Sequence, residues 1–337
     1  MEEINQKICI AILNWNGYDW LKKNLSKIIK YSNKAKVVVI DNNSTDKSVS
    51  YVKSNYKSVE LISNPENYGF SKGYNSAIKK INFDFLLLIN NDVEVTKDYI
   101  KPLYKFLVKN KEFAAVQPKI LDGNNKNKFE YSGAAGGYID YFGIPFCKGR
   151  IGNVVEKDKG LYNKDSTVFW CSGACFLIRR KDFLKVGGFD EDFFMHQEEI
   201  DLCWRIQGLN KKIGYTYKSK VYHYGGGSLK TGNWKKNYFN HRNNLLMLFK
   251  NLPLIDLIII IINRAILDVF ISINHLLKFK LFNFFSIYLA YASFIIMLPK
   301  FIHKRKPINT KFYGKYNIHI IFLYLIRRKK KFYKIFN

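Results

Sequence analysis

The chain of 337 residues is long enough to bury a core and to form one large or two modest domains. Hydrophobic residues make up 47% and aromatic residues 16% of it, which excludes a mainly disordered protein. The net charge of +28 favours an anionic partner, and five scattered cysteines without a CxxC pair support neither a zinc module nor a disulfide framework.

The first hundred residues alternate between short apolar runs and helical periodicity. The predicted elements are strands over 7–14, 36–40, 59–62 and 84–89 and helices over 17–30 and 71–80. The last strand contains FLLLI, which shows no alternation and is typical of a strand buried on both faces. This order predicts an α/β fold with a parallel sheet covered by helices and with functional residues at the carboxyl ends of the strands.

Polar residues follow each of these four strands. They are Asn14 and Asn16, Asp41-Asn42-Asn43, Asn64-Pro65-Glu66-Asn67, and Asn90-Asn91-Asp92. The turn preferences of Asn and Asp explain any one of these segments. Four of them at one edge of one sheet favour a binding site.

The middle of the chain is less regular. Residues 110–165 are rich in Gly and Tyr and predict loops over the sheet. The later predictions are a strand over 167–179 broken at Gly173, a helix over 198–208, a strand over 221–224 and an amphipathic helix over 234–250. We expect residues 1–250 to form one catalytic domain.

After Pro253 the chain becomes apolar and basic, and residues 251–337 carry 15 Lys and Arg but two acids. Residues 281–299 form an uncharged run at the lower limit of membrane-spanning length. The polar Asn283 within this run favours a helix that lies in the membrane interface over one that spans the membrane. A helix packed on the catalytic domain is the alternative.

We therefore expect residues 251–337 to be a helical, membrane-associating basic tail that is attracted to an anionic membrane surface. The N-terminus shows no secretory signal. Together these features predict a peripheral or monotopic protein on the cytoplasmic face of a membrane. The basic residues are densest beside apolar helices, which argues against a nucleic-acid partner.

Two residues are candidate ligands for a divalent metal, Mn²⁺ or Mg²⁺. Asp92 follows a buried strand and offers carboxylate oxygen, and His223 offers an imidazole. In an enzyme that uses a nucleotide sugar, the leaving group is a diphosphate, and such an ion would neutralise its charge as a Lewis acid. Taken alone, Asp92 has the alternative explanation of a turn carboxylate, and His223 is better explained as a half-buried strand histidine.

A candidate base lies further along the chain, where Glu198, Glu199 and Asp201 fall within one helical turn. Crowding of like charges raises the pKa of one carboxyl group and favours its use as a base. The alternative is an acidic helix start stabilised by the helix dipole, which explains at least one of the three.

Five segments, in this order, resemble the motifs of family 2 glycosyltransferases, and more narrowly their bacterial rhamnosyltransferase-like branch. They are VVVIDNNSTDKS, NPENYGFSKGYN, FLLLINNDVEV, WCSGACFLIRRKDFLKVGGFDEDFFMHQEEIDLCWRI and VYHYGGGS, and the resemblance covers residues 7 to about 228. It implies a GT-A fold, meaning a Rossmann-like, mostly parallel sheet flanked by helices. It also implies a nucleotide-sugar donor, a divalent metal and inversion by single displacement.

The resemblance assigns roles by position. It implies donor or nucleotide binding by Asn14, Asp41, Asn67, Gly69, Gly73, Asn75 and Asn91. For Gly69 and Gly73, a role in turns and packing is an equal alternative. It implies an acceptor cleft lined by Trp170, Ser172, Gly173 and Glu198.

It further implies that Glu199 is the catalytic base, where the family often has aspartate, and that Asp92 and His223 bind the metal. Asn90 stands where the family's metal motif commonly begins with aspartate, and this departure weakens the expected metal affinity.

The sequence thus predicts an enzyme that transfers a sugar from a nucleotide-diphosphate sugar to a hydroxyl of a lipid-linked glycan acceptor, with inversion, in cell-surface polysaccharide synthesis. Two alternatives stay open: a nucleotidyltransferase that makes the nucleotide sugar, and a basic nucleic-acid-binding protein. LNWNGYDW after the first strand lacks the Gly-rich loop with Arg and Lys of the former, and lacks the GxGxxG of a dinucleotide oxidoreductase.

Overall fold

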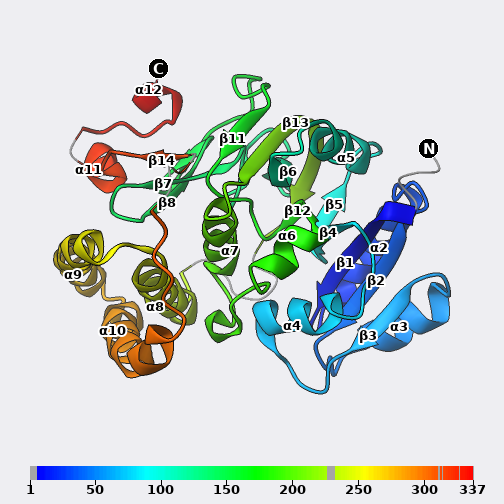
Figure 1. The fold of residues 1–337 in the computed structure, drawn as a ribbon, viewed down its shortest axis with the longest axis horizontal. Coiled ribbons are helices and arrows are strands. Elements are labelled where there is room, and N and C mark those ends of the chain that lie inside the picture. Colours follow the sequence, from blue (N-terminus) through cyan, green and yellow to red (C-terminus); the bar gives the residue numbers. More distant parts are fainter. Residues whose placement is uncertain (1–5, 226–231, 310–311, 313, 326, 337) are drawn as a thin grey trace.

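The computed structural model describes residues 6–225, 232–309, 312, 314–325 and 327–336, and its centre is a mixed β-sheet with helices on both faces (Figure 1). The strand order is β11-β13-β6-β12-β4-β1-β2-β3, with β5 paired to β13. These strands are β1 (Ile8–Asn14), β2 (Lys36–Asp41), β3 (Glu60–Ser63), β4 (Phe85–Asn90), β5 (Val93–Val95), β6 (Phe113–Asp122), β11 (Ser166–Val168), β12 (Cys175–Arg179) and β13 (Lys212–His223).

The half of the sheet formed by β3, β2, β1 and β4 is parallel, as predicted. Asn14 pairs in register with Asp41, and Leu13 pairs with Asn90. The polar strand ends therefore lie side by side at one edge, because parallel strands of matched register end together.

Successive residues of these strands enter two different cores, since side chains alternate across a strand. Cys9 and Ala11 pack in the core beneath α4, α6, α7 and α8, whereas Ile8 and Ile10 pack in the core beneath α2, α3 and α5. The helices of the catalytic region are α2 (Tyr18–Lys30), α3 (Ser48–Asn55), α4 (Gly69–Ile78), α5 (Ile100–Lys109), α6 (Arg180–Lys185) and α7 (Glu198–Gln207), with a 3₁₀ turn η1 (Glu191–Phe193). This architecture confirms the predicted fold class.

The prediction of loops over 110–165 is wrong for much of that segment. β6 is a central strand, buried along almost its whole length, and it pairs with β12 and β13. A second, five-stranded sheet follows in the order β10-β9-β8-β7-β14. Its strands are β7 (Gly137–Asp140), β8 (Pro145–Cys147), β9 (Arg150–Ile151), β10 (Val154–Val155) and β14 (Lys315–Tyr316).

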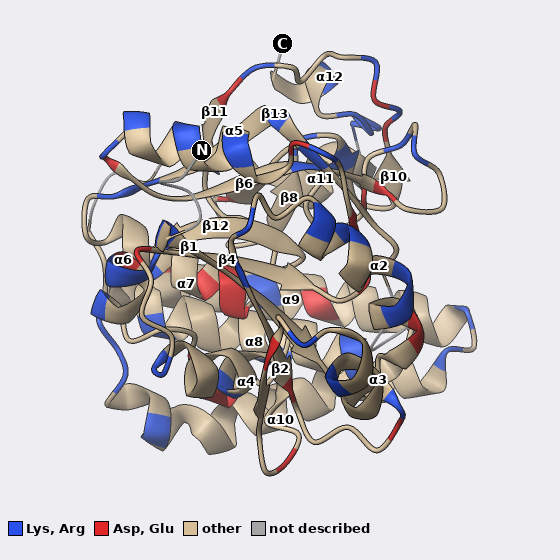
Figure 2. Cartoon of the chain, turned by 90° about the vertical axis from the view of Figure 1, so that its right-hand side faces the viewer, with Lys and Arg blue, Asp and Glu red and all other residues tan. Residues whose placement is uncertain are grey.

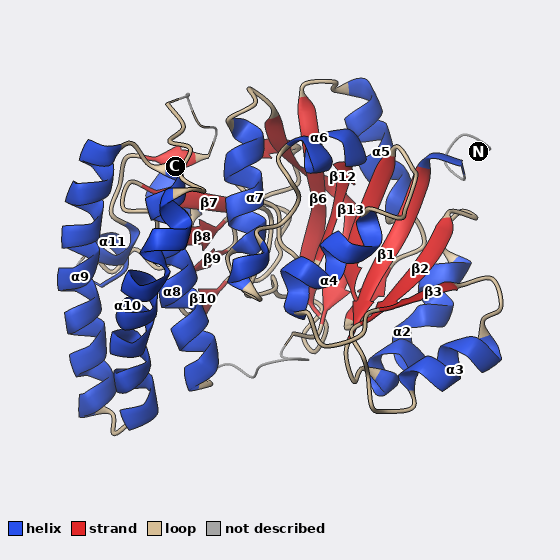
Figure 3. Cartoon of the chain, turned by 60° about the horizontal axis from the view of Figure 1, so that its bottom comes forward, coloured by secondary structure: helices blue, strands red, loops and turns tan. Residues whose placement is uncertain are grey.

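Three long helices lie together on the side of the molecule away from β3 (Figures 1 and 3). They are α8 (Trp234–Asn251), α9 (Leu254–Leu277) and α10 (Leu281–Ile302). α10 packs on α8 through polar contacts, in which Tyr238 Oη donates to Ser293 Oγ at 2.9 Å and Asn237 Nδ2 donates to Ser286 Oγ at 2.9 Å. Within the described ranges, α10 is the one helix whose length and apolar composition would suit a membrane span.

The last forty residues return to the catalytic region. β14 adds a parallel strand to β7, and the short helices α11 (Ile320–Leu325) and α12 (Tyr333–Phe336) follow it. The ring centroids of Phe332 and Phe336 lie 4.4 Å apart, and both rings contact that of Phe146 in β8. Figure 2 shows Lys and Arg spread over helices and loops on several sides of the chain.

Candidate active site

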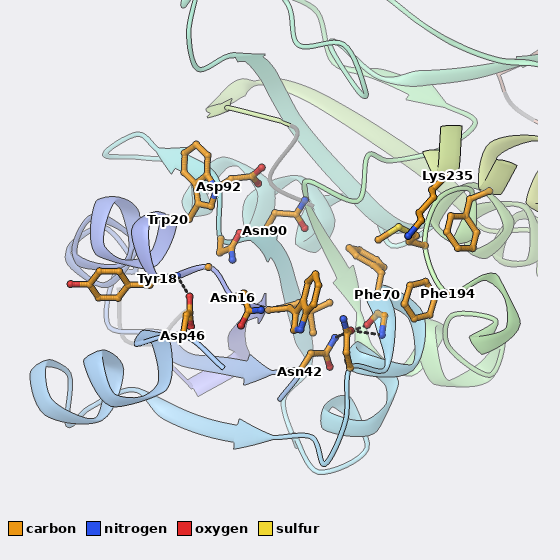
Figure 4. A pocket seen from close by; sticks show the side chains of 18 of the residues that line it. Asn16, Tyr18, Trp20, Asn42, Asp46, Phe70, Asn90, Asp92, Phe194 and Lys235 are labelled. Carbon is orange, nitrogen blue, oxygen red and sulfur yellow. Dashed lines mark hydrogen bonds between the residues drawn. The ribbon is translucent and has the colours of Figure 1, made fainter. Parts of the chain in front are cut away.

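A pocket of about 750 Å³ opens at the carboxyl ends of β1, β2 and β4 (Figure 4). One wall comes from the segments that follow these strands, and the opposite wall comes from the loop before α7 and from α8. In Figure 4, Tyr18 and Asp46 lie on the first side, and Phe194 and Lys235 lie on the second. The pocket thus occupies the place predicted from the polar strand ends.

Asn14 and Asp41 lie beneath this pocket and hold its first wall together. Asn14 is 1% exposed, and its Nδ2 donates to Asp41 Oδ1 at 3.2 Å and to Ser48 Oγ at 3.0 Å. Its Oδ1 accepts from Asn91 Nδ2 at 2.9 Å, and Asp41 Oδ1 accepts from Ser44 Oγ at 2.6 Å. The two buried side chains therefore position the loops after three strands.

Asn67 and Gly69 line the pocket directly. Asn67 Oδ1 accepts from the Gly69 backbone N at 3.0 Å. Gly69 has a φ of +68°, and a Cβ there would lie 2.7 Å from the Phe194 carbonyl oxygen. Only glycine satisfies both constraints at this helix start.

Gly73 and Asn75 lie further along α4 and serve packing in this structure. A Cβ on Gly73 would lie 2.9 Å from the side chain of Asn42, which is a pocket residue. Asn75 binds the backbone of Phe189 twice, since Nδ2 donates to its carbonyl at 2.8 Å and Oδ1 accepts from its N at 3.0 Å. Both residues fix α4 relative to the site.

Asp92 and His223 come together although 131 positions separate them. β13 pairs with β5, and His223 Nε2 lies 3.1 Å from Asp92 Oδ1. On the other side of the ring, His223 Nδ1 lies 3.3 Å from Glu130 Oε1. Burial alone would lower the pKa of His223, but the charges of Asp92 and Glu130 raise it well above its usual value.

This arrangement fits a divalent cation. Asp92 offers a carboxylate oxygen and His223 an imidazole nitrogen, donors that Mn²⁺ accepts, and the two atoms face each other at 3.1 Å. A histidine that binds metal usually donates its other ring N–H to a carboxylate, and Glu130 is placed to accept it. Among the described residues no group of three His, Cys, Asp or Glu side chains is placed to hold a metal ion.

Glu198 and Glu199 begin α7 beside this pair, in an adjoining pocket of about 480 Å³ that Asp92, His223, Ser172 and Gly173 also line. Burial raises the pKa of Glu199 to about 7, although hydrogen bonds from backbone N–H groups, including that of Gly173, oppose the rise. Burial and the charge of Glu199 raise the pKa of Glu198 well above its usual value. Glu199 thus titrates near pH 7.

Asp201, the third acid of this turn, differs from the two glutamates in having cationic partners. Asp201 is fully buried, with Oδ2 2.8 Å from both Arg205 Nε and Lys250 Nζ. These cations keep the pKa of Asp201 below its usual value despite burial. Asp201 ties α7 to α8 and has no access to the pocket.

The loop before α7 is strained and held from α8. Phe194, His196 and Gln197 have φ values of 61°, 69° and 71°, a conformation that costs of order 1–3 kcal/mol for each non-glycine residue. Asn243 Nδ2 donates to the carbonyls of Phe193, Met195 and His196 at 2.8–2.9 Å. The helix α8 thereby holds the segment that delivers Glu199.

The pockets join around Glu199. The 480 Å³ pocket shares Phe70 and Asp92 with the larger pocket, and it shares Glu199 and Lys236 with a third pocket of about 340 Å³. Trp170 is 3% exposed and lines this third pocket, where its Nε1 donates to the Tyr138 carbonyl at 3.0 Å. The predicted cleft residues are therefore divided between two pockets on either side of the candidate base.

Residues 9–187 match the profile of Glycosyl transferase family 2, which is more than half of the chain. The chain belongs to glycosyl transferase family 2. It is 26% identical over 224 residues to the rhamnosyltransferase WbbL of Escherichia coli K12, a match that covers 64% of this chain and 83% of that one. It is 27% identical over 206 residues to the N-acetylglucosaminyl-diphospho-decaprenol L-rhamnosyltransferase of Mycobacterium tuberculosis, covering 56% of this chain and 66% of that one.

Among solved structures, the fold resembles that of GalNAc-T7 with UDP, GalNAc and Mn²⁺. The TM-score is 0.58 at 17% identity, and the match covers 74% of this chain and 48% of that one. The fold is therefore GT-A-like. The chain is a glycosyltransferase whose relatives act in glycan biosynthesis.

Several site residues of the glycosyltransferase were not predicted from its sequence. Glu130 lies in the Gly- and Tyr-rich segment that gave no periodic signal. Trp15, Tyr18 and Trp20 line the larger pocket, and their density in NWNGYDW was a signal of a stacking surface. Of the motif VYHYGGGS, residues 226–228 lie outside the described residues.

Proposed function

We propose that this glycosyltransferase transfers a sugar from a nucleotide-diphosphate sugar to a hydroxyl of a lipid-linked glycan in cell-surface polysaccharide synthesis. The transfer inverts the anomeric configuration by single displacement. One observation carries the mechanism: Glu199, with a pKa raised to about 7, lies in the wall between the pocket that contains Asp92 and the third pocket.

The larger pocket would bind the nucleotide. Its aromatic side chains Trp15 and Tyr18 offer faces on which a base can stack, and the amides Asn42 and Asn67 offer donors and acceptors for the ribose or base. Asn14, Asp41 and Asn91 support this wall from below through their hydrogen bonds.

Asp92 and His223 would hold the metal, with Glu130 orienting the imidazole. When bound, an ion such as Mn²⁺ or Mg²⁺ neutralises the charge of the diphosphate leaving group. Gly173 lies close to the Phe70 ring, since a Cβ at this position would be 3.2 Å from it. Because glycine has no side chain, the space beside Glu199 stays open for the sugar.

Glu199 would accept the proton of the acceptor hydroxyl as that oxygen attacks the anomeric carbon from the face opposite the diphosphate. A base whose pKa lies near the working pH combines a useful ionised fraction with enough basicity. Burial and the charge of Glu199 raise the pKa of Glu198, which would line the cleft beside this base.

The test is an assay of the purified chain with a panel of nucleotide sugars, Mn²⁺ and a prenyl-diphosphate-linked N-acetylglucosamine as acceptor. We expect one donor to yield a glycosylated lipid of inverted anomeric configuration, determined by NMR, and expect EDTA to abolish the reaction. A product that retains the donor's configuration would refute single displacement, and no transfer from any donor would refute the proposed reaction.

We also propose that α9 and α10 attach the enzyme to an anionic membrane surface on its cytoplasmic side. Most of the exposed large apolar side chains of the described residues lie on these two helices and their connection, with Phe279 91%, Phe282 75% and Ile296 77% exposed. Lys278 and Lys280 lie in the connection between the two helices, and Lys and Arg near an apolar face favour anionic lipid.

Sedimentation with vesicles tests this attachment. We expect the chain to bind vesicles containing anionic phosphatidylglycerol more tightly than vesicles of phosphatidylcholine alone. Substitution of both Phe282 and Ile296 by Asp should abolish binding, because each charge opposes insertion of the apolar face. Val108→Asp on α5, where the side chain is 48% exposed, is the matched control and should bind normally. Equal binding by all variants would contradict the proposed surface.

A further inference from the structure

The third pocket, of about 340 Å³, lies on the far side of Glu199 from Asp92. Three separate elements bring cations to it: Arg150 comes from β9, Lys236 from α8 and Arg264 from α9. None of these three residues lines the pocket of about 750 Å³. Of the three, Lys236 also lines the pocket of about 480 Å³ that contains Asp92 and His223.

The positive charge in this pocket is incompletely balanced. Arg264 pairs with Asp268 at 3.2 Å, but within the described part of the chain neither Arg150 nor Lys236 forms an ion pair with a carboxylate. Glu130 acts on Lys236 only from beyond ion-pair distance, and its Oε1 already lies against His223. Burial, together with the charge of Arg150, lowers the pKa of Lys236, as expected for a cation without a counterion.

Several polar atoms of the residues around this pocket are buried without a hydrogen-bond partner among the described residues. They include the Nε atoms of Arg150 and Arg264, Nε2 of His196, Oε1 of Gln197 and Oδ1 of Asn244. An unpaired buried polar group costs about 1–3 kcal/mol, so such a concentration indicates a polar ligand. Arg264 is only 7% exposed, so its unpaired Nε lies inside the protein and not at the solvent-exposed surface.

An apolar exit adjoins the cations. Ile271 of α9 lines the pocket, and the neighbouring residues Val269, Phe270 and Ile273 are 46%, 65% and 44% exposed. The same helix therefore offers Arg264 to the pocket and an apolar face to the surroundings. A ligand with a phosphate at one end and a hydrocarbon chain at the other would satisfy both.

We propose that Arg150, Lys236 and Arg264 bind the phosphate or diphosphate of the acceptor, a prenyl-phosphate-linked sugar, whose hydroxyl then faces Glu199 while its lipid leaves along α9. This inference rests on the proposed function and adds the residues that recognise the phosphate of its lipid-linked acceptor. A free phosphate ion shares the same chemistry, and the experiment separates the two sources.

Isothermal titration calorimetry of the full chain with farnesyl phosphate, in EDTA and a non-denaturing detergent, measures this site without catalysis. We expect the wild-type chain to bind farnesyl phosphate, and Lys236→Gln and Arg150→Gln each to weaken binding about tenfold or more, because each removes a charge-assisted hydrogen bond. Lys53→Gln, an exposed lysine of α3, makes the same charge change elsewhere and should bind as wild type does.

Arg150→Lys keeps the charge and should restore much of the affinity that Arg150→Gln loses, which separates recognition from misfolding. Binding of UDP or dTDP should be unchanged in all four variants, since these residues lie outside the nucleotide pocket. Farnesol should bind far more weakly than farnesyl phosphate, and inorganic phosphate should compete only at much higher concentration.

Equal affinity of wild type and Lys236→Gln for farnesyl phosphate would overturn the site, as would absence of wild-type binding. Inorganic phosphate that binds as tightly as farnesyl phosphate would overturn the lipid-linked ligand. A chain that binds farnesyl phosphate through Lys236 but transfers no sugar would instead refute the proposed function and leave the anion site intact.

Discussion

Two groups of buried carboxylates lie within one turn of α7 and differ in their counterions. Asp201 has Arg205 and Lys250 at 2.8 Å, and its pKa is lowered. Glu198 and Glu199 have no cation within ion-pair distance among the described residues, and their pKa values are raised. The same helix thus carries acids of opposite behaviour.

The difference separates structural acids from acids available for chemistry. A buried carboxylate with two cations is ionised at all working pH values and stabilises the packing of its neighbours. A buried carboxylate without a cation holds its proton to higher pH, which suits proton transfer but costs stability once ionised. Burial by itself does not distinguish the two roles, whereas the neighbouring charges do.

Substitution of the two adjacent glutamates would test this distinction most strongly. Glu199→Gln should reduce kcat by roughly 10²–10⁴-fold, because no base remains for the acceptor hydroxyl, with nucleotide affinity nearly unchanged. Glu198→Gln should change kcat much less, because Glu198 does not line the third pocket and is not the proposed base. Steady-state kinetics and nucleotide titrations measure both, and a wild-type rate in Glu199→Gln would disprove its role as base.

Asp201→Asn should have its main effect on stability. The substitution leaves Lys250 and Arg205 beside a neutral amide in a buried site, which we expect to cost roughly 3–5 kcal/mol in the free energy of unfolding. Urea denaturation measures this cost. Glu112→Gln, which removes an exposed pair with Lys212 at 3.9 Å, is the control and should change stability by about 0.5 kcal/mol or less. Comparable losses in the two variants would show that the Asp201 cluster is not structural.

Glu130 provides an intermediate case, since its partner is a histidine rather than a permanent cation. Glu130→Gln should weaken Mn²⁺ binding by about 10–100-fold, because His223 loses the carboxylate that orients its ring and increases its basicity. Calorimetric titration with Mn²⁺ in the absence of substrate measures this effect. Glu60→Gln, at the edge strand β3, should leave Mn²⁺ affinity unchanged, and an equal affinity in Glu130→Gln would exclude the proposed orienting role.

The smallest expected effect is a difference between the pH dependence of stability and the pH dependence of the transfer rate. Glu199 has a pKa of about 7 in the fold and 4.5 as a free side chain, so the folded state binds more protons between these values. Stability should therefore fall as pH rises from about 4.5 to 7, whereas the transfer rate should rise until it levels above pH 7. Parallel thermal unfolding and rate profiles check the opposite signs, and a rate independent of pH below 7 would contradict the assignment.

The parallel half of the sheet was predictable because each strand carries its own signal. VVVI and FLLLI are continuous apolar runs, and the polar residue that ends each run marks the functional edge. β6 was not predicted because Gln117, Pro118 and Lys119 interrupt its apolar pattern. These residues are accommodated by tertiary partners, since Gln117 Oε1 accepts from the Ser172 N at 2.9 Å and Lys119 pairs with Asp158 at 2.7 Å.

The site was predictable only in part for a similar reason. Asp92, His223 and Glu199 lie together as the motif order suggested, in and around one pocket. Arg150 lies in β9 of the second sheet, whose short strands depend on long-range pairing such as that between β7 and β14. Glu130 is placed by the isolated bridge between Phe129 and Leu121 of β6. No local pattern in the sequence encodes those pairings, so the residues they position could not be assigned.

The return of the chain end through β14 has a practical consequence for handling the protein. A fragment ending near residue 250 would expose the edge of β7 to pairing with other chains. It would also strip the rings of Phe332 and Phe336 from the second sheet, and remove Lys304 from Asp190 and Asp192. Solubility is therefore better sought by polar substitutions on the outer faces of α9 and α10 than by shortening the chain.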